Sequence, residues 1–393
     1  MTRRALVACA NYWESPIQVG DHHLARGLVA RGFDVAFISN PVSPLHLLAG
    51  SSPLRSERFR SYRTGGRRAL DGRLWSYSPG ALVVPHAEPL LRGRWVMDHW
   101  HRTTFPSVDR KVRQEGFGEV DLLYVREAKQ AFWADRIRYQ KLVFRVADRD
   151  SRFPGHNRHL RKLERRLARR ADLVVYSAAN LRDYVESLGA RRIFHLPNGV
   201  DYSHFAGYSG MPPADLASIP APIAVYAGSL DVWFDYELVR NLAAERPAIQ
   251  FVLIGPPSAQ ARQLAEERAN VHVLGAKPFG ELPGYLRQAS VGIIPFDVHR
   301  HRELVDSINP IKLYEYLACG LPVVSVAWQE LETLGSPAIL CRSREDFLRG
   351  LDDALKQPRL DPGRAAFAAQ HDWGNRIDRL LEALQFTTSA VVG

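Results

Sequence analysis

The sequence predicts an α/β protein of two Rossmann-like domains, and three observations predict it. Short apolar runs alternate with amphipathic helical patterns, which is typical of parallel sheets covered by helices. Residues 206–222 are rich in Pro, Gly, Ser and Ala, as linkers are. The 393 residues suit two domains better than one. We therefore expect domains over residues 1–205 and 223–367, and a C-terminal helix within 368–393 that returns to the first domain.

The first domain opens on a predicted βαβ unit. Its elements are the strand Ala5–Ala10, the loop Asn11–Gly20, the helix Asp21–Arg31 and the strand Val35–Ser39. In such a sheet ligands bind at the carboxyl ends of the strands, so the loop and the start of the helix belong to a cleft. His22 and His23 stand there, either as acceptor-binding residues or as ordinary polar residues of a first helical turn.

Later strands bring a carboxylate to the same edge of the sheet. The expected order is strand Asp121–Val125, helix Ala128–Arg138, strand Lys141–Ala147, basic helix Arg158–Arg170, strand Leu173–Ser177, helix Asn180–Leu188 and strand Ile193–Leu196. Asp148 follows its strand directly, and Asp150 comes two residues later. A carboxylate at the end of a parallel strand is well placed for proton transfer, whereas a structural ion pair with Arg145 or Arg149 is the alternative.

Residues 50–110 combine arginine with large apolar side chains. Seven arginines lie in Arg55–Arg73, opposed only by Glu57 and Asp71. The apolar residues that follow are Trp75, Tyr77, Leu82–Val84, Leu90, Leu91, Trp95, Trp100 and Phe105. Indole rings at headgroup level and guanidinium groups on lipid phosphates are typical of a membrane interface. Core aromatics beside solvated charge are the alternative, and the pattern slightly favours the interface.

The charge is divided unevenly along the chain. Residues 1–200 hold 35 Lys/Arg and 19 Asp/Glu, a net charge of +16, whereas residues 201–393 hold 17 and 23, a net charge of −6. The basic first half is expected to meet an anionic membrane surface, a lipid-linked phosphate or a nucleic acid. A uniformly basic nucleic-acid-binding protein is not expected to divide its charge in this way, so we expect no nucleic-acid partner.

Cysteine usage and hydropathy indicate a cytoplasmic protein, with peripheral attachment to the inner face of the cell membrane as a further expectation. Cys9, Cys319 and Cys341 are odd in number and lie far apart, so they form no disulfide or metal-binding spacing. No apolar run approaches the roughly 20 residues of a membrane helix. The apolar run near the N-terminus is too short for a signal peptide.

The second domain repeats the alternation of strands and helices. The expected elements are strands Ile223–Tyr226, Phe251–Ile254, Val271–Leu274, Gly292–Pro295, Val323–Val326 and Ala338–Cys341, with helices Tyr236–Ala244, Ala259–Glu267, Leu282–Ala289 and Glu345–Leu355. Glycine follows three of these strands, at Gly228, Gly255 and Gly275, which allows a ligand to approach closely. No G-x-G-x-x-G or P-loop is present, so the usual dinucleotide and NTPase fingerprints are missing.

The segment Ser307–Ser325 reads as a helix followed at once by a buried strand. Asn309 is a suitable N-cap, and Pro310 fits the first helical position. Lys312 and Glu315 are three residues apart and share a face near the helix N-terminus, which favours a phosphate. The pattern fits a nucleotide site, with Lys312 on a diphosphate and Glu315 on a ribose, or an ordinary surface ion pair.

These features resemble the GT-B glycosyltransferases, in which two Rossmann-like domains face each other across a cleft. The run Pro310–Val324, PIKLYEYLACGLPVV, looks like the nucleotide-sugar motif of family 4-type enzymes. Asn198–Asp201, with Phe205 after it, looks like their N-G-V-D-x-x-x-F at the domain hinge. The run Leu142–Asp148 is similar to a strand of the inverting glucuronosyltransferase of xanthan assembly that ends in the general-base Asp.

The resemblance implies the role of general base for Asp148 and of donor diphosphate contact for Lys312, and Glu315 stands where family 4-type enzymes have the Glu expected on the donor ribose. The chemistry of the reaction then assigns the diphosphate also to Asn309 and Ser229, and the nucleobase to the backbone around Gly275, Ala276 and Lys277. His22 and His23 remain the candidates for the acceptor region. The implied donor is a nucleoside-diphosphate sugar, UDP-linked, and the implied acceptor is a saccharide or a lipid-linked saccharide. No metal or other cofactor is implied, and no D-x-D motif within a GT-A pattern is found.

Three positions depart from the resembling families. Retaining family 4-type enzymes carry E-x7-E, and the first Glu would fall on Ser307. This departure favours an inverting reaction. Phe296 stands where the xanthan enzyme has Tyr, so a hydroxyl role is lost, and Glu315 stands where it has Gln. The alternatives are a retaining family 4-type transferase, a nucleotide-sugar epimerase of the same fold and a basic nucleic-acid-binding protein.

Overall fold

The computed structural model describes residues 2–44, 53–85, 93–148 and 158–386. The chain forms two compact units: unit 1 contains the residues up to Ser15, residues 21–196 and the chain from Ile377 onward, and unit 2 contains residues 16–20 and 197–376. Residues 206–222, expected as the linker, therefore belong to unit 2. Leu216 of this segment is buried there, and Asp215 accepts hydrogen bonds from Lys277 and Tyr285.

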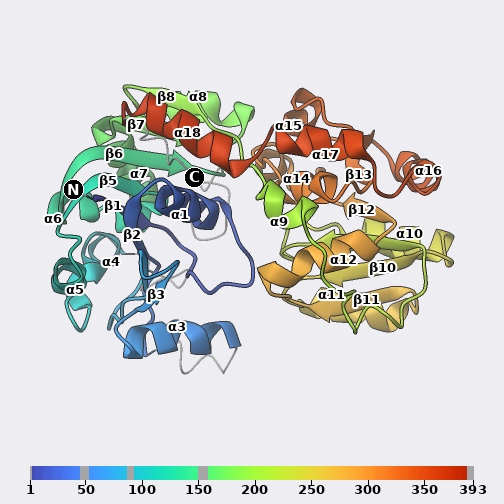
Figure 1. Cartoon of the computed structure of the whole chain (residues 1–393), viewed down its shortest axis with the longest axis horizontal. Coiled ribbons are helices and arrows are strands. Elements are labelled where there is room, and N and C mark those ends of the chain that lie inside the picture. The colour runs from blue at the N-terminus through green and yellow to red at the C-terminus, as the bar shows by residue number, and fades with distance from the viewer. Residues whose placement is uncertain (1, 45–52, 86–92, 149–157, 387–393) are drawn as a thin grey trace. The chain divides into compact units, whose positions relative to one another are not determined.

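Unit 1 is built on an eight-stranded sheet in the order β3-β4-β2-β1-β5-β6-β7-β8 (Figure 1). Its strands are β1 Arg3–Ala8, β2 Phe33–Ile38, β3 Arg67–Ala69, β4 Leu74–Tyr77, β5 Glu119–Val125, β6 Arg138–Val146, β7 Leu173–Tyr176 and β8 Ile193–His195. Its helices are α1 Gly20–Ala30, α3 Pro53–Arg63, α4 Arg94–His99, α5 Val108–Gln114, α6 Trp133–Arg136, α7 Arg158–Arg170 and α8 Arg182–Ser187. Among the strand pairs of this sheet that the structure describes, β3–β4 is antiparallel and the others are parallel. The parallel strands run through a continuous apolar core, because both faces of such a sheet are covered.

The helix expected over residues 128–138 is wrong. A 3₁₀ turn, Ala128–Gln130, and the short helix α6 occupy the segment, and β6 already begins at Arg138. The first residues of β6 pair with Glu119 and Val120 of β5, so strand pairing takes the end of the expected helix. The buried side chain of Gln130 donates to the carbonyl oxygen of Cys9 over 2.7 Å, which holds the turn against β1.

The C-terminal helix α18 spans Trp373–Ala383, and its residues from Ile377 onward belong to unit 1. Within that unit, Arg31 at the end of α1 donates to Asp378 of α18, with Nη2 to Oδ2 at 2.7 Å. Arg192, next to β8, donates to the carbonyl oxygen of Ala383. These contacts attach the end of the chain to the first sheet and its helices.

Unit 2 is built on a six-stranded, entirely parallel sheet in the order β11-β10-β9-β12-β13-β14 (Figure 1). Its strands are β9 Ile223–Ala227, β10 Gln250–Ile254, β11 Val271–Gly275, β12 Val291–Ile294, β13 Val323–Val326 and β14 Ile339–Cys341. Its helices are α9 Tyr202–Ala206, α10 Tyr236–Glu245, α11 Ala259–Glu267, α12 Leu282–Gln288, α13 Arg302–Val305, α14 Ile311–Ala318, α15 Gln329–Thr333, α16 Arg344–Ala354 and α17 Pro362–Ala369. The order reverses beside β9, and such a switch point is where ligands bind in open α/β sheets.

The hydrophobic core of unit 2 is centred on its sheet and on α14. Leu313, Tyr314, Tyr316 and Leu317 of this helix are all fully buried. The prediction of a helix followed at once by a buried strand is therefore confirmed for α14 and β13. Among the helices of the described residues, none combines the length and the apolar character that a membrane span requires.

Candidate active site

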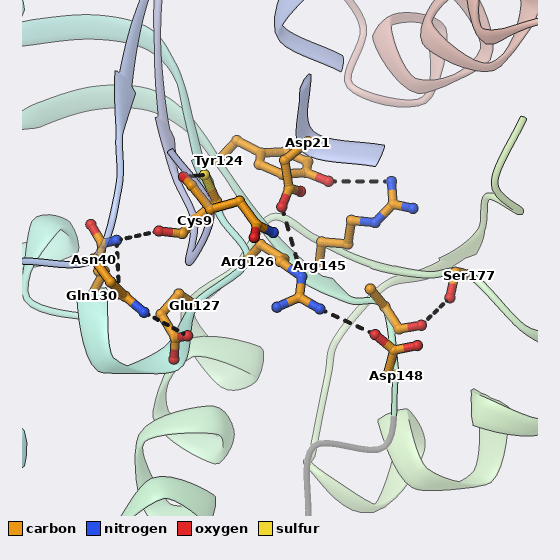
Figure 2. A network of polar contacts seen from close by, with 12 residues as sticks. Cys9, Asp21, Asn40, Tyr124, Arg126, Glu127, Gln130, Arg145, Asp148 and Ser177 are labelled. Atoms are coloured by element: carbon orange, nitrogen blue, oxygen red, sulfur yellow. Dashed lines mark hydrogen bonds and ion pairs between the residues drawn. The ribbon is translucent and has the colours of Figure 1, made fainter. Parts of the chain in front are cut away.

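A cluster of charged side chains lies where β5 and β6 of unit 1 end (Figure 2). Asp148 comes two residues after β6, and Arg126 directly after β5. Arg126 Nη2 donates to Asp148 Oδ2 over 3.1 Å, and Arg126 Nε lies 3.7 Å from Oδ2 of Asp21 in α1. One guanidinium thus serves two carboxylates from different elements.

The two carboxylates differ in exposure, which separates what each can do. The side chain of Asp148 is 28% exposed, whereas that of Asp21 is 2% exposed. Burial raises the pKa of both groups because it disfavours the charged form, and Arg126 and Arg145 partly offset this increase. Asp148 is therefore the carboxylate of this pair that an incoming molecule can reach, and its raised pKa makes it a stronger base than an ordinary aspartate.

A second layer of buried polar groups supports this cluster. The Arg145 guanidinium lies 3.4 Å from the hydroxyl of Tyr124, and both side chains are buried in the sheet. The Ser177 hydroxyl donates to the carbonyl oxygen of Ala147, the residue before Asp148. Figure 2 shows the contact of Ser177 close to Asp148, and the contact between Arg145 and Tyr124 beside Asp21. They hold the end of β6 in place, which limits the movement of the Asp148 backbone.

Sequence reasoning identified Asp148 but missed Arg126 and Asp21 as its neighbours. Arg145 and Arg149 were the partners considered; the structure describes the pair with Arg126, whereas Arg149 and Asp150 lie outside the described residues. The signal for Arg126 was present in its position immediately after a predicted strand, the same pattern that singled out Asp148.

Both predicted acceptor histidines lie in the first turns of α1 and are buried. His22 Nε2 donates to the carbonyl oxygen of Tyr12 over 3.0 Å, and its ring packs against those of Trp13 and Phe37. His23 is 3% exposed. The contacts of His22 fix the loop after β1, which fits the alternative of ordinary structural residues better than direct contact with an acceptor.

The second group of candidate residues lies in unit 2 around Lys312. The Lys312 ammonium is 4.6 Å from the ring centroid of Phe296 and 5.2 Å from that of Tyr226. Aromatic faces attract a cation without neutralising it, so the charge remains available to an anion. Burial lowers the pKa of Lys312 to about 8, and nearby Glu315 partly offsets the decrease. The amine is thus still mainly protonated at pH 7.

Glu315 lies one turn further along α14 and is 7% exposed. Burial raises its pKa to about 7, although Lys312 partly opposes the increase. The prediction of a surface ion pair is excluded by this burial. A buried carboxyl group that ionises near neutral pH can accept hydrogen bonds from vicinal hydroxyl groups, as a ribose presents them.

Asn309 is not the N-cap of α14, so that prediction is wrong. Pro310 occupies the cap position without a side-chain hydrogen bond, and the helix begins at Ile311. The Asn309 amide instead accepts from the backbone N–H of Asn198 over 3.0 Å and donates to Glu330 over 2.8 Å. Its side chain therefore joins the segment before α9 to α14 and α15. Because its amide oxygen and nitrogen both have partners within the protein, the predicted contact of this side chain with a diphosphate is not favoured.

The end of β9 is shaped to leave room beside Lys312. A Cβ on Gly228 would lie 3.0 Å from Lys312 Cε, and a Cβ on Gly255 would lie 2.0 Å from the carbonyl oxygen of Gly228. Tyr226 donates to the carbonyl oxygen of Ser229 over 2.8 Å, which fixes the turn. The predicted diphosphate residue Ser229 thus lies in the loop next to Lys312. Gly255 makes room for protein backbone, not for a ligand.

The predicted nucleobase region lies at the end of β11. Gly275 ends the strand with a positive φ of 75°, and Ala276 and Lys277 follow it. The Lys277 ammonium forms an ion pair with Asp215. Because Lys277 is paired, only the backbone of this region is left for hydrogen bonds to a base. Across the described ranges, no group of three His, Cys, Asp or Glu side chains could hold a metal ion.

The aromatic stretch in unit 1 divides into buried and exposed residues. Trp75, Tyr77 and Trp100 are core residues, with at most 2% of each exposed. Leu82, Trp95 and Phe105 are 69%, 57% and 79% exposed. Leu90, Leu91 and Arg92 lie outside the described residues. The interpretation as core aromatics is therefore confirmed for the buried residues, whereas the membrane interface stays a prediction for the exposed ones.

Two family models match the chain. The model of the glucuronosyltransferase GumK N-terminal domain matches residues 7–177, and the model described as glycosyl transferase-like matches residues 236–382. The first match contains Asp21, Arg126 and Asp148, and the second contains Lys312 and Glu315. Each group of candidate residues thus lies in a segment with its own family match.

The chain is also similar to one curated relative and to two solved structures. A protein of Bacillus subtilis (strain 168) described as a teichuronic acid biosynthesis glycosyltransferase, TuaH, is 24% identical over 187 residues, which are 46% of this chain and 46% of that protein. The match thus spans less than half of that relative's length.

The structures are those of trehalose-6-phosphate from E. coli bound with UDP-2-fluoro glucose, at a TM-score of 0.67, and of Anabaena Alr3699/HepE in complex with UDP and glucose, at 0.61. The first structure is 12% identical to this chain, and the match covers 98% of this chain and 99% of that one. The second is 15% identical, and the match covers 98% of this chain and 100% of that one. At this level of identity the likeness concerns the fold, and it confirms the predicted GT-B fold of two Rossmann-like domains.

Proposed function

We propose that this chain, a GT-B glycosyltransferase that resembles GumK, transfers a sugar from a UDP-sugar to a hydroxyl group of a saccharide or lipid-linked acceptor with inversion at the anomeric carbon. The observation that carries the proposal is Asp148, a partly exposed carboxylate with a raised pKa at the carboxyl end of a parallel strand. This is the position where α/β folds bind their ligands.

The chemistry requires one proton acceptor. The acceptor oxygen bonds to the anomeric carbon, the bond from that carbon to the diphosphate breaks, and the hydroxyl proton passes to Asp148. A general base is more effective when its pKa is closer to the working pH, and the burial of Asp148 moves its pKa in that direction. Arg126 acts as a positioning residue, because it holds one oxygen of the Asp148 carboxylate.

The leaving diphosphate gains negative charge as the bond breaks, and unit 2 supplies a cation for it. Lys312 lies at the start of α14, where unpaired backbone N–H groups also favour an anion. The proposed leaving-group stabilisation therefore comes from Lys312, the N-terminus of α14 and the loop at Ser229. We expect transfer without a divalent metal ion, so that EDTA leaves the rate unchanged.

We also propose that the acceptor is reached at an anionic membrane surface. Leu82, Trp95 and Phe105 expose apolar side chains within a unit that carries most of the positive charge of the chain. Arg94, whose side chain is 77% exposed, lies next to Trp95. Exposed aromatic and basic side chains in one segment suit the interface between lipid headgroups and acyl chains.

The test is transfer by the full chain. The protein is incubated with a panel of nucleotide sugars and a membrane lipid extract, and the products are identified by mass spectrometry. The anomeric configuration of the product is then read from NMR coupling constants. Inversion supports the proposal, and retention would exclude Asp148 as the base for direct displacement. Isomerised nucleotide sugar without transfer would instead support an epimerase.

A further inference from the structure

The carboxylate of Asp21 lies close to the proposed base but is closed to an incoming molecule. Asp21 stands in the first turn of α1, and 2% of its side chain is exposed. Its Oδ2 is buried without a hydrogen bond to any described residue, and it lies 3.7 Å from Nε of Arg126. Burying a carboxylate is unfavourable unless charged neighbours compensate for the lost water. The charges around Asp21 therefore decide what this residue does.

The titratable and charged side chains that interact electrostatically with Asp21 come from β1, β5 and β6 or from the residues just after them: Cys9, Tyr124, Arg126, Glu127, Arg145 and Asp148. Burial raises the pKa values of Cys9 and Tyr124, so both stay neutral near pH 7. The Glu127 carboxylate accepts a hydrogen bond from the Asn40 amide over 3.4 Å. Two guanidinium groups are left to balance the carboxylates of Asp21 and the proposed base.

One rigid group, the Arg126 guanidinium, joins these two carboxylates (Figure 2). Its Nη2 donates to Asp148 over 3.1 Å while its Nε lies at Asp21. Because a guanidinium is planar and its donors have fixed directions, an anchor at Nε also sets the direction of Nη2. A proton on Oδ2 of Asp21 would face this cation and find no acceptor among the described residues. The ionised form of Asp21 is therefore favoured beside Arg126.

We infer that Asp21 is a positioning residue for the proposed base, because its buried carboxylate anchors Arg126 and draws guanidinium charge away from Asp148. The inference deepens the proposed function, on which it rests. The resemblance to known glycosyltransferases gives a role to Asp148 and none to Asp21 or Arg126. Asp21 thus keeps Asp148 basic although a cation contacts it.

The inference fixes the direction in which the pKa of Asp148 responds to a change at Asp21. Asp21→Asn keeps the shape of the side chain and removes its charge, so Arg126 then acts on Asp148 alone. The charged form of Asp148 is stabilised and its pKa falls, whereas Arg126→Gln should raise it. A residue that only packs the start of α1 would not produce this pair of opposite changes.

The test measures the pKa of Asp148 in the full chain. Aspartate is labelled with ¹³C at Cγ, the Asp148 signal is identified by its absence in Asp148→Asn, and its chemical shift is followed by NMR against pH. Asp21→Asn should lower this pKa by about half a unit or more. The matched control is Asp109→Asn, because Asp109 in α5 also has a pKa raised by burial and lies 3.7 Å from Nε of an arginine, Arg136. The control should leave the pKa of Asp148 unchanged.

A second arm asks whether the effect of Asp21 passes through Arg126. Asp21→Asn is repeated in an Arg126→Gln background, where its effect on the pKa of Asp148 should fall to less than half. An undiminished effect would assign it to direct repulsion between the carboxylates and would overturn the positioning role. With Arg126 present, an unchanged or raised pKa in Asp21→Asn, or an equal decrease in the Asp109 control, would overturn it as well. Thermal unfolding of each variant is measured first, and Asp21→Ala removes the same charge if the Asn variant does not fold.

Transfer kinetics separate this inference from the proposed function. The acidic limb of the kcat/KM profile should move to lower pH in Asp21→Asn by the same amount as the pKa of Asp148. If the pKa falls and the limb does not follow, the coupling of Asp21 to Asp148 is supported and the role of Asp148 as the base is refuted. A lower rate with an unchanged pKa of Asp148 would leave Asp21 a purely structural role and overturn the inference.

Discussion

The guanidinium of Arg126 donates to the carboxylate of Asp148 over 3.1 Å, although the two residues are 22 positions apart in the chain. The same guanidinium lies 3.7 Å from the buried carboxylate of Asp21. One cation is shared between two carboxylates, so it lowers the pKa of Asp148 by less than burial raises it. The pKa of Asp148 therefore stays above its ordinary value. The cluster therefore keeps a basic carboxylate in a fixed orientation.

This relationship predicts a change in the pH dependence of transfer. Arg126 lowers the pKa of Asp148, so Arg126→Gln should raise it further. The acidic limb of the kcat/KM profile should then move to higher pH, by about one unit or more. Arg126→Lys retains a charge and should shift the limb less. A lower rate with an unmoved acidic limb would show that Arg126 has only a structural role.

Asp148→Asn should remove the base and preserve the shape of the side chain. We expect kcat to fall by about a hundredfold or more, the usual effect of losing a general base, while the Kd for UDP stays within twofold. The control is Asp183→Asn, which changes an exposed aspartate in the first turn of α8. Transfer rates and UDP titration calorimetry provide the two readouts. Wild-type kcat in Asp148→Asn would refute the assignment.

Lys312→Ala should weaken UDP binding, because the diphosphate loses its cation. We expect the Kd for UDP to rise at least tenfold, which corresponds to about 1.4 kcal/mol. Lys356→Ala is the control, since Lys356 is exposed in the same unit and pairs only with Asp353 among the described residues. Calorimetry on both variants and on the wild type decides the question. Equal Kd values in all three would place the donor site elsewhere.

The buried Glu315 should make stability depend on pH. Its pKa of about 7 in the folded protein exceeds the ordinary value of 4.5, so the folded state holds a proton that the unfolded state releases. The contribution to stability is therefore fully present below pH 4.5 and is lost as the pH rises through 7. Glu315→Gln does not titrate, so the unfolding free energy of the wild type relative to this variant should fall by about 3 kcal/mol across that range.

Urea unfolding of both proteins at several pH values checks this expectation. Glu266→Gln, a change at an exposed position of α11, should follow the wild type throughout. Parallel curves for the wild type and Glu315→Gln would show that the carboxyl group titrates normally. Glu315→Ala should in addition raise the KM for the donor more than it lowers kcat, because a ribose contact is similar in the ground state and in the transition state.

The exposed apolar residues of unit 1 should control membrane binding. The full chain should co-sediment with anionic liposomes at low salt, and binding should weaken as salt screens the basic surface. Replacing Leu82, Trp95 and Phe105 with Ser should reduce the bound fraction severalfold. The control variant replaces Met211 and Leu360 of unit 2 with Ser in the same way; these side chains are 85% and 47% exposed. Equal binding by both variants would argue against this surface, and equal binding to neutral liposomes would argue against the basic charge.

Much of the fold could be predicted because it depends on local patterns. Apolar runs such as Val323–Val326 and amphipathic helices such as α7 are readable from spacing alone. The pair Lys312 and Glu315 was found in the same way, since both residues lie on one helix. The helix expected over 128–138 was wrong because pairing of β6 with β5 outweighed a local helical pattern.

Adjacent residues are enough to predict the two α/β halves, the basic first half, the carboxylate after β6 and the Lys–Glu spacing on α14. They do not predict that Arg126 contacts both Asp21 and Asp148, because this contact follows from the order of the strands in the sheet. The packing of distant segments also buries Trp75 and leaves Trp95 exposed. Burial and charge pairing depend on distant segments, and they set the pKa values on which the proposed chemistry rests.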